Sequence, residues 1–200
     1  MTSLNEEWKS AQEWERNWWM TYRNQHPAEI TKNSFVSKMM FLNEGVPDSS
    51  VLDIGCGPLS LLLRVPVKRG VALDPIHYGD LEEEYDKKGI QRLVKRGEDL
   101  TVEDGMFDEA WIYNCLQHVE DPTKIIENAL TVSKVVRIFE WTHIKPYKGH
   151  LHELTPALLT EPFTKSKWHT LMTTTGFLNH SGLNGNYFMG IFSKQAKQTL

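Results

Sequence analysis

The chain lacks several features that define other classes of protein. It has only two cysteines, Cys56 and Cys115, which lie far apart and form no CxxC motif, so a reducing cytoplasm is the expected compartment. No apolar run approaches the about 18 residues that a membrane-spanning helix needs, and no signal-peptide core opens the chain. The formal net charge is −4, which argues against a nucleic-acid surface, because phosphate binding needs a basic footprint. We therefore expect a globular protein with no membrane span and no nucleic-acid partner.

The clearest positive feature is an apolar run that ends in a glycine-rich loop. Residues 51–60 read Val-Leu-Asp-Ile-Gly-Cys-Gly-Pro-Leu-Ser, and a predicted helix begins at residues 59–63. A strand, a tight glycine turn and a helix are the parts from which an open α/β sheet builds a nucleotide site beyond the carboxyl ends of its strands. This stretch therefore predicts a nucleotide site.

Predicted strands and helices alternate along the rest of the chain. Asp121-Pro122 and Thr155-Pro156 each predict a helix start, because Asp and Thr cap helices and proline fits the first helical position. The alternation indicates a mostly parallel sheet with helices on both faces, and a C-terminal hairpin would add an antiparallel strand near one edge. The predicted fold class is α/β, a Rossmann-like doubly wound sheet with N-terminal helices. The further strands are expected at residues 67–74, 91–98, 107–114 and 135–141, a helix at 81–88, and the hairpin from 176–177 through 182–193, its second arm being 187–192.

Two helices are predicted before the sheet, at residues 3–24 and about 29–42, with Pro27 between them. The first carries four of the seven tryptophans, which gives it a large apolar area. It either packs on the edge of the domain or covers a ligand pocket as a lid, and both can hold together. We expect residues 1–44 to form a helical cap and residues 45–200 a single globular unit. The apolar stripe of the first helix consists of Leu4, Trp8, Ala11, Trp14, Trp18 and Tyr22.

Charge near the glycine loop separates two nucleotide cofactors. Ser60 stands where the dinucleotide fingerprint has its third glycine. Asp53, just before the loop, would face the anionic pyrophosphate of a nicotinamide dinucleotide, whereas it can hold the ammonium group of S-adenosylmethionine. Asp74, at the end of the next strand, is placed to bind both ribose hydroxyls. These residues favour S-adenosylmethionine, and an oxidoreductase is the disfavoured reading.

Four sequence blocks carry a resemblance to one enzyme family. They are DIGCG at residues 53–57, VALD at 71–74, GEDL at 97–100 and FDEAWIYNCLQHVEDP at 107–122. In order and spacing they resemble class I S-adenosylmethionine-dependent methyltransferases, most of all the methyltransferase type 11 group, over about residues 45–145. The resemblance implies a seven-stranded sheet with its last strand antiparallel, and S-adenosylmethionine as cofactor.

The resemblance also implies roles for residues at the strand ends. Residues 116–118 would begin the wall between cofactor and substrate. Two loops depart from the family pattern: residues 131–134 read Thr-Val-Ser-Lys in place of Lys-Pro-Gly-Gly, and Pro66 cuts short the helix after the glycine loop. The residues implied to contact the cofactor are Asp53, Gly55 and Gly57 at its methionine, Asp74 at its ribose, Glu98, Asp99 and Leu100 at its adenine, and Asn114 at its sulfonium side.

Histidines that follow the fourth and fifth strands are the candidate catalytic residues. A hydroxyl acceptor needs a base, and histidine is the side chain best suited to that task near neutral pH. His118 follows the fourth strand, although its Leu-x-His-Val setting also fits a packing role. His143 and His150 follow the fifth strand, where substrate-binding loops lie. His150 and His152 on an extended segment could bind a metal, but the segment also reads as the approach to a helix, and we assign no metal site.

The absence of two motifs limits the classes of methyl acceptor that we expect. Neither cysteine follows a proline, which argues against cytosine-C5 methylation, and residues 114–117 read Asn-Cys-Leu-Gln instead of the Asn/Asp-Pro-Pro-Tyr/Phe signature of enzymes that methylate nucleic-acid amino groups. The expected function is O- or N-methylation of a small-molecule acceptor. The alternative is a methyltransferase-like domain that holds the cofactor, or serves as a partner subunit, without catalysis. The sequence leaves the acceptor and the oligomeric state open. The residues expected at the substrate or in the lid are Trp18, Trp19, Tyr22 and His152.

Overall fold

The computed structural model describes residues 4–25, 47–79, 82–180 and 183–194. The helix predicted at about residues 29–42 lies outside these residues. Within them, no helix is both long and apolar enough to span a bilayer. The helices and strands, with short 3-10 turns labelled η, are α1 (Leu4–Gln25), β1 (Ser50–Ile54), η2 (Leu61–Leu63), β2 (Arg69–Leu73), α4 (Glu82–Lys87), β3 (Gln91–Leu93), η4 (Gly97–Asp99), η5 (Val102–Asp104), β4 (Phe107–Tyr113), η6 (Leu116–His118), α5 (Pro122–Val132), β5 (Ser133–Thr142), α6 (Pro156–Lys165), β6 (His169–His180) and β7 (Leu183–Ser193).

The strands form one seven-stranded sheet in the order β3-β2-β1-β4-β5-β7-β6. The pairs from β3 to β5 are parallel, whereas β7 runs antiparallel to both β5 and β6. The order reverses at β1, so the loops after β1 and β4 meet at the switch point, where open α/β sheets bind ligands. The predicted mostly parallel sheet with an antiparallel strand near one edge is confirmed.

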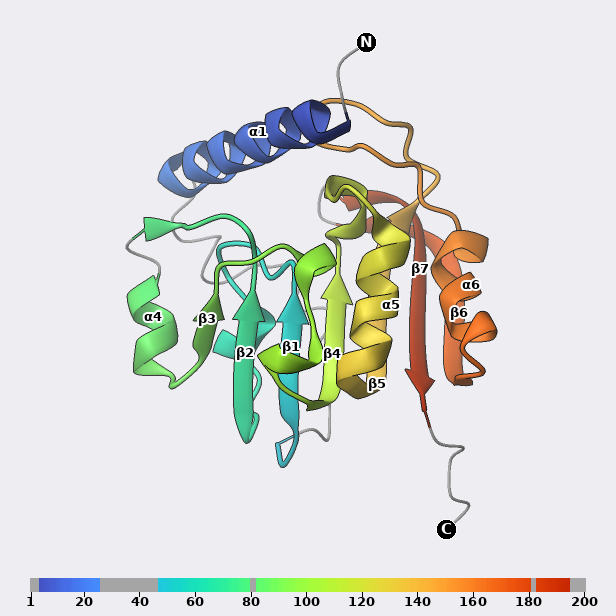
Figure 1. The fold of residues 1–200 in the computed structure, drawn as a ribbon. Coiled ribbons are helices and arrows are strands. Elements are labelled where there is room, and N and C mark those ends of the chain that lie inside the picture. Colours follow the sequence, from blue (N-terminus) through green and yellow to red (C-terminus); the bar gives the residue numbers. More distant parts are fainter. Residues whose placement is uncertain (1–3, 26–46, 80–81, 181–182, 195–200) are drawn as a thin grey trace.

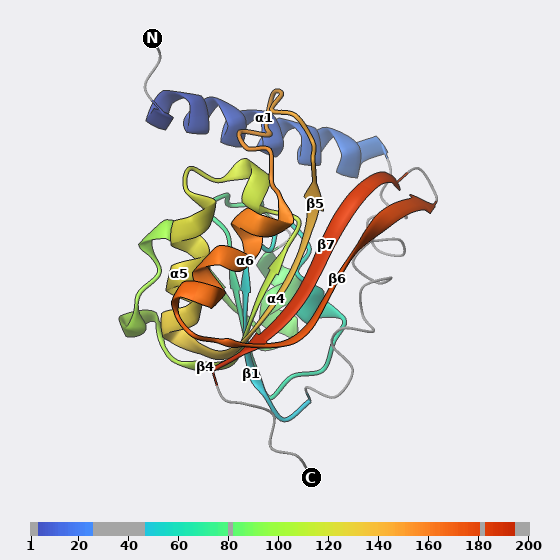
Figure 2. The ribbon, with the colours of Figure 1, turned by 90° about the vertical axis from the view of Figure 1, so that its right-hand side faces the viewer.

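Both faces of the sheet carry helical elements. Helices α5 and α6 lie on one face (Figure 2), where Ile125, Ile126 and Phe163 join the main apolar core. On the other face, Leu62 of η2 and Tyr85 of α4 pack in a second core cluster. Two such cores are expected for a sheet buried between layers of helix.

The starts of α5 and α6 are those predicted from Asp-Pro and Thr-Pro. The Asp121 carboxylate accepts a hydrogen bond from the Lys124 backbone N–H at 3.0 Å, and Pro122 is the first helical residue. The Thr155 hydroxyl accepts in the same way from Leu158 N–H at 3.2 Å. Each cap satisfies a backbone donor that the first turn of the helix leaves unpaired.

Helix α1 lies across the carboxyl ends of the parallel strands (Figure 1). Ala11 is buried, and Trp8 and Trp14 are half-buried, as the predicted stripe requires. The stripe is wrong at Trp18, which is 42% exposed. Its ring stacks on Trp14 and meets Trp19 edge-on, so it extends the aromatic row on the helix surface instead of entering the core.

Three predicted elements differ in length. The helix predicted after the glycine loop is only the turn η2, which ends before Pro66. Strand β3 ends at Leu93 instead of residue 98, because it is an edge strand and pairs with β2 over three residues only. The hairpin begins at His169, well before the predicted Gly176, since β6 pairs with β7 as far back as His169↔Ser193.

Candidate functional site

The glycine loop after β1 is held against the end of β2. The backbone N–H groups of Gly55 and Cys56 both donate to Leu73 O, at 2.8 and 3.1 Å. Gly55 has φ +68°, and a Cβ atom there would lie 2.5 Å from the Cβ of Cys115. Gly57 has φ +60°, and no atom lies within 4 Å of its Cβ position. Gly55 therefore lets the loop pass the turn after β4, and Gly57 leaves one side of the loop open for close approach by a ligand.

Asp74 joins the glycine loop to the turn after β2. Its carboxylate accepts hydrogen bonds from the backbone N–H groups of Gly57 and Ile76, both at 2.9 Å. Burial raises the pKa of Asp74, while the two backbone donors and Arg92 act to lower it. The carboxylate thus sits at the end of β2 beside the open side of Gly57, a position from which it can accept from ligand hydroxyls.

Asp53 lies deeper than its position before the loop suggests. It is 3% exposed, and its carboxylate accepts from the Ser60 hydroxyl at 2.5 Å. Ser60 in turn caps η2 by accepting from Leu62 N–H at 3.1 Å. Burial raises the pKa of Asp53 to about 6. Asp53 therefore also fixes the geometry of the glycine loop through Ser60, which caps η2.

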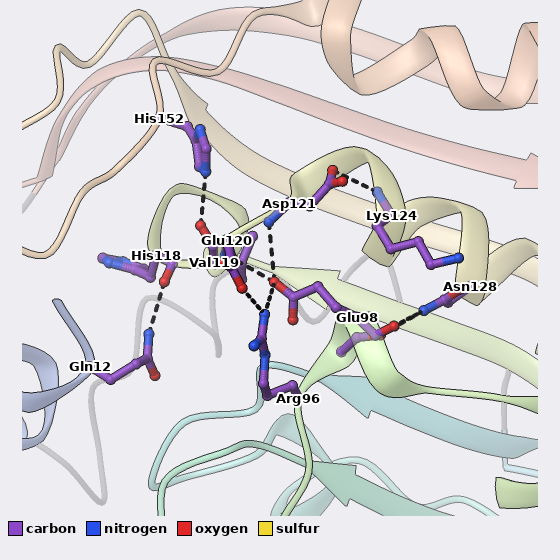
Figure 3. A network of polar contacts seen from close by, with 11 residues as sticks. Gln12, Arg96, Glu98, His118, Val119, Glu120, Asp121, Lys124, Asn128 and His152 are labelled. Atoms are coloured by element: carbon purple, nitrogen blue, oxygen red, sulfur yellow. Dashed lines mark hydrogen bonds and ion pairs between the residues drawn. The ribbon is translucent and has the colours of Figure 1, made fainter. Parts of the chain in front are cut away.

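Residues 98–100 divide among three environments. The Glu98 carboxylate accepts from the backbone N–H groups of Glu120 and Asp121, at 2.9 and 3.2 Å, and lies 3.5 Å from Arg96 (Figure 3). Leu100 is 2% exposed and belongs to the main core. Asp99 is exposed. Of the three predicted adenine contacts, Asp99 alone has an exposed side chain, while Glu98 holds the start of α5.

The turn after β4 brings several polar groups together. Asn114 has φ +56° and is exposed, and its side-chain oxygen accepts from the Gln117 amide at 2.9 Å. Glu140, from the end of β5, is fully buried and accepts from the backbone N–H groups of Cys115 and Leu116, both at 3.0 Å. Burial raises the pKa of Glu140 to about 8, so the carboxyl is protonated at neutral pH. Among the described residues, Gln117 Oε1 and Glu140 Oε2 are buried without a hydrogen-bond partner.

His118 lies between this turn and the loop at residues 147–150. Its Nδ1 is 3.0 Å from Gly149 O and 3.2 Å from Glu15 Oε1, and its Nε2 is 3.2 Å from the Gln117 amide nitrogen. A carbonyl at Nδ1 and an amide donor at Nε2 favour the tautomer with the proton on Nδ1. Burial lowers the pKa of His118 to about 4, so the imidazole is neutral.

The other candidate histidines occupy different positions. His150 packs edge-on against His118, with ring centroids 4.6 Å apart. His152 bonds through Nε2 to Val119 O at 2.8 Å (Figure 3), and His143 is exposed at the end of β5. The structure thus brings His118, His150 and His152 to one region, and leaves His143 at its outer edge.

Helix α1 closes over this region. The Gln12 side chain donates to His118 O at 2.8 Å (Figure 3), and the Trp8 ring lies under the Arg96 guanidinium, 4.3 Å from its centroid. A Cβ on Gly149 would lie 2.7 Å from the Trp14 ring and 2.9 Å from Glu15 Oε1, so the helix rests directly on this glycine. Of the predicted lid residues, Trp18 and Trp19 lie on α1, and the side chain of Tyr22 is outside the described residues.

An open hollow of about 530 Å³ lies between α1 and the turn after β2. Gln12, Glu13 and Arg16 line it from α1, and residues 75–77 line it from the turn that Asp74 begins. It therefore adjoins the carboxylate predicted to bind ribose. A hollow beyond the carboxyl ends of the strands of an open α/β sheet is an expected location of a ligand.

Glu15 and Gln117 are site residues that the sequence patterns do not single out, whereas Glu140, near the end of a predicted strand, fits either a pocket-shaping or an ordinary strand-end role. Glu15 lies on a helix whose other acids are mostly exposed, and its partners, His118 and Gly149, are far away in the chain. Gln117 stood inside a family block and was read only as part of a wall. Glu140, an acid within a β-branched and aromatic run, was a detectable signal of a buried polar role.

The fold and site define a nucleotide-binding α/β domain of the methyltransferase type, and comparison with known proteins agrees. Residues 52–135 match the model of the family described as "Methyltransferase domain". An uncharacterized protein of Methanocaldococcus jannaschii is 28% identical over 115 residues, 56% of this chain and 54% of that protein. The match therefore spans about half the length of the curated relative.

Solved structures share the fold at low sequence identity. The 1,6-didemethyltoxoflavin-N1-methyltransferase of Burkholderia thailandensis, solved with its substrate and S-adenosylhomocysteine, has a TM-score of 0.67 at 16% identity, covering 98% of this chain and 92% of that chain. An S-adenosylmethionine-dependent methyltransferase of Thermotoga maritima has a TM-score of 0.64 at 15% identity, covering 90% and 95%. The resemblance to class I S-adenosylmethionine-dependent methyltransferases is confirmed, and S-adenosylmethionine is the indicated cofactor.

Proposed function

We propose that the protein transfers a methyl group from S-adenosylmethionine to a small-molecule acceptor, by O- or N-methylation, in the cytoplasm. The observation that carries the proposal is the placement of Asp74, which follows β2, beside the open side of Gly57 in the loop after β1. The net charge of −4 and a structural neighbour named as a 1,6-didemethyltoxoflavin-N1-methyltransferase support a small acceptor over nucleic acid.

The residues present fit the cofactor. Gly57 offers an open backbone approach, Asp74 offers carboxylate oxygens for two ribose hydroxyls, and the exposed Asn114 and Asp99 lie at neighbouring strand ends. Gly55 shapes the loop. Asp53 supports the loop through its hydrogen bond with Ser60, Glu98 holds the start of α5, and Leu100 packs in the main core. S-adenosylmethionine supplies a methyl group on a positively charged sulfur. We propose residues 1–44 as the cap and residues 45–200 as the domain that binds the cofactor.

His118 is the candidate base that the geometry favours. Its Nδ1–H is held by Gly149 O, so the Nε2 lone pair is the one that can accept a proton from a hydroxyl acceptor. Gln117 now donates to that nitrogen and would have to turn toward the acceptor. His150, packed against His118, is the second candidate, and the exposed His143 and the bonded His152 are more remote candidates for acceptor contact.

Calorimetry tests cofactor binding directly. We expect S-adenosylmethionine and S-adenosylhomocysteine to bind, and NAD and NADP not to bind. Tight binding of NAD, or no binding of S-adenosylmethionine, would contradict the assignment. Release of S-adenosylhomocysteine with a panel of alcohols, amines and acids then separates an enzyme from the alternative, a methyltransferase-like subunit that only binds the cofactor.

A further inference from the structure

Glu15 is a carboxylate held at the centre of the α1 contact. Its side chain is 12% exposed, one oxygen lies 3.2 Å from His118 Nδ1, and the same oxygen rests on Gly149. Trp19, one turn further along α1, provides a hydrogen bond. A long acidic side chain is rarely buried without a partner of opposite charge.

The groups that surround Glu15 do not supply that charge. His118 is neutral, and Asp74, on the facing side of the site, is close enough to raise the pKa of Glu15 through its own negative charge, in addition to the larger effect of burial. Arg92, whose positive charge acts to lower the pKa of Asp74, donates to Cys56 Sγ at 2.8 Å and to Ala72 O at 3.0 Å. In the described part of the chain, the ion-pair contact recorded for Glu15 is with His118 alone. Glu15 and Asp74 therefore place two carboxyl groups on this side of the site, where Arg92 acts on Asp74 and burial raises the pKa of Glu15 to about 7.

Glu15 lies between two parts of the proposed cofactor site. On one side it touches His118, which follows Asn114 at the end of β4, and on the other it interacts electrostatically with Asp74 and Tyr78 at the end of β2. With the ribose at Asp74 and the sulfonium toward Asn114, the methionine part of the cofactor lies between these two strand ends. This step rests on the proposed function.

We propose that Glu15 makes α1 a lid that recognises the positive charge of S-adenosylmethionine and so discriminates it from the uncharged-sulfur product, S-adenosylhomocysteine. The sulfonium carries one positive charge that the thioether product lacks, while the other parts of the two molecules are the same. With the substrate present, Glu15 and Asp74 face a cation, which favours the docked position of α1. With the product present, that cation is absent, so Glu15 loses the interaction that favours its ionised form and the docked position of α1.

Glu15→Gln tests the proposal, because it removes the charge and nearly preserves the shape and the hydrogen bonds. Dissociation constants for S-adenosylmethionine and S-adenosylhomocysteine are measured by calorimetry in the wild type, in Glu15→Gln and in Glu7→Gln, which changes an exposed acid of the same helix. We expect Glu15→Gln to weaken S-adenosylmethionine binding about tenfold, equivalent to about 1.4 kcal/mol, and to change S-adenosylhomocysteine binding less than about twofold. Glu7→Gln should leave both constants unchanged.

The possible outcomes separate the two proposals. Equal weakening for both ligands would show that Glu15 acts only in packing α1, and no change for either would show that it does not face the cofactor; both results overturn the inference while the proposed function stands. A wild-type protein that binds neither ligand would overturn the proposed function and the inference together. Thermal unfolding of Glu15→Gln close to that of the wild type establishes that a selective loss comes from charge and not from misfolding.

Discussion

The two halves of the carboxyl edge of the sheet are built in different ways. At β1 and β2, backbone groups and one carboxylate close the site: Gly55 and Cys56 bond to Leu73 O, and Asp74 bonds to Gly57. At β4 and β5, side chains from segments far apart in the chain meet, as where Glu15 reaches His118. The first half is a rigid loop fixed by local geometry, whereas the second depends on the docking of α1. Under the proposed function, the first half binds the cofactor and the second half decides when the cofactor is enclosed.

The largest expected effect lies where the two halves touch. Gly55→Ala places a Cβ 2.5 Å from the Cβ of Cys115 and requires φ +68° of a residue that disfavours it. Overpacking and backbone strain together should destabilise the fold by about 3 kcal/mol. Chemical denaturation measures the loss. Gly57→Ala, with φ +60° and no atom within 4 Å of its Cβ position, is the matched control and should cost about 1–2 kcal/mol. Equal losses in the two variants would mean that the loop is not in contact with the turn after β4.

Asp74→Ala addresses the rigid half. It removes the carboxylate that we expect to bind ribose and frees the N–H groups of Gly57 and Ile76. Loss of two charge-assisted hydrogen bonds should weaken S-adenosylmethionine binding about 100-fold, as measured by calorimetry. Removal of the exposed Asp86 carboxylate, by Asp86→Ala, is the control. Binding that survives Asp74→Ala unchanged would place the cofactor elsewhere.

Glu140 provides a pH test of the second half. Burial raises its pKa in the folded protein to about 8, whereas the unfolded chain has the ordinary value near 4.5. The folded state therefore binds one more proton between these values, so stability is fully present below about pH 4.5 and falls as pH rises toward 8. The slope contributed by one group is at most about 1.4 kcal/mol per pH unit, or about 2 kcal/mol between pH 6 and pH 8.

Glu140→Gln should remove this part of the pH dependence, since the amide oxygen still accepts from Cys115 and Leu116 N–H. Denaturant unfolding at pH 6, 7 and 8 measures the slope in wild type and variant. Glu127→Gln, at an exposed position of α5, should retain the wild-type slope. A wild-type slope in Glu140→Gln would show that the carboxyl is ionised in the folded protein.

The same division separates what could and could not be predicted from sequence. The glycine loop, Asp74 and the caps Asp121 and Thr155 were predictable because their partners lie within about 20 residues and follow from strand, turn and cap chemistry. Glu15 was not, because its environment arises only when α1 packs on residues far along the chain. The last residue of β3 and the first residue of β6 differ from the prediction for a related reason. Pairing with a neighbouring strand sets these positions, and local propensity does not.

Glu98 shows that a recognisable position does not determine what a side chain contacts. Its family block implied an adenine contact, yet its carboxylate accepts from the backbone at the start of α5, beside Arg96. Arg96 also lies over Trp8 of α1 (Figure 3 shows its polar contacts). The network therefore links residues 96–98 and the start of α5 to α1, a connection that no single block of sequence contains.

Gly149→Ala offers the gentlest perturbation of the second half. The added methyl group would lie 2.7 Å from the Trp14 ring and 2.9 Å from Glu15 Oε1, so α1 must shift outward while the sheet stays intact. We expect binding of S-adenosylmethionine and S-adenosylhomocysteine to weaken alike, by less than about tenfold. Limited proteolysis of α1 should become faster. Because the added methyl group should displace α1 as a whole, Gly149→Ala should affect both ligands alike, whereas Glu15→Gln should affect S-adenosylmethionine selectively.

Gly89→Ala is the control, because Gly89 lies between α4 and β3 and is not part of the α1 contact. Its φ of +65° means that alanine there costs stability, and no atom lies within 4 Å of its Cβ position. It should leave both dissociation constants and the proteolysis of α1 unchanged. If Gly149→Ala also leaves them unchanged, α1 rests on the domain edge without enclosing the cofactor. Enclosure of the cofactor would then not depend on the contacts of Trp14 and Glu15 with Gly149, which are among those that join α1 to the loop after β5.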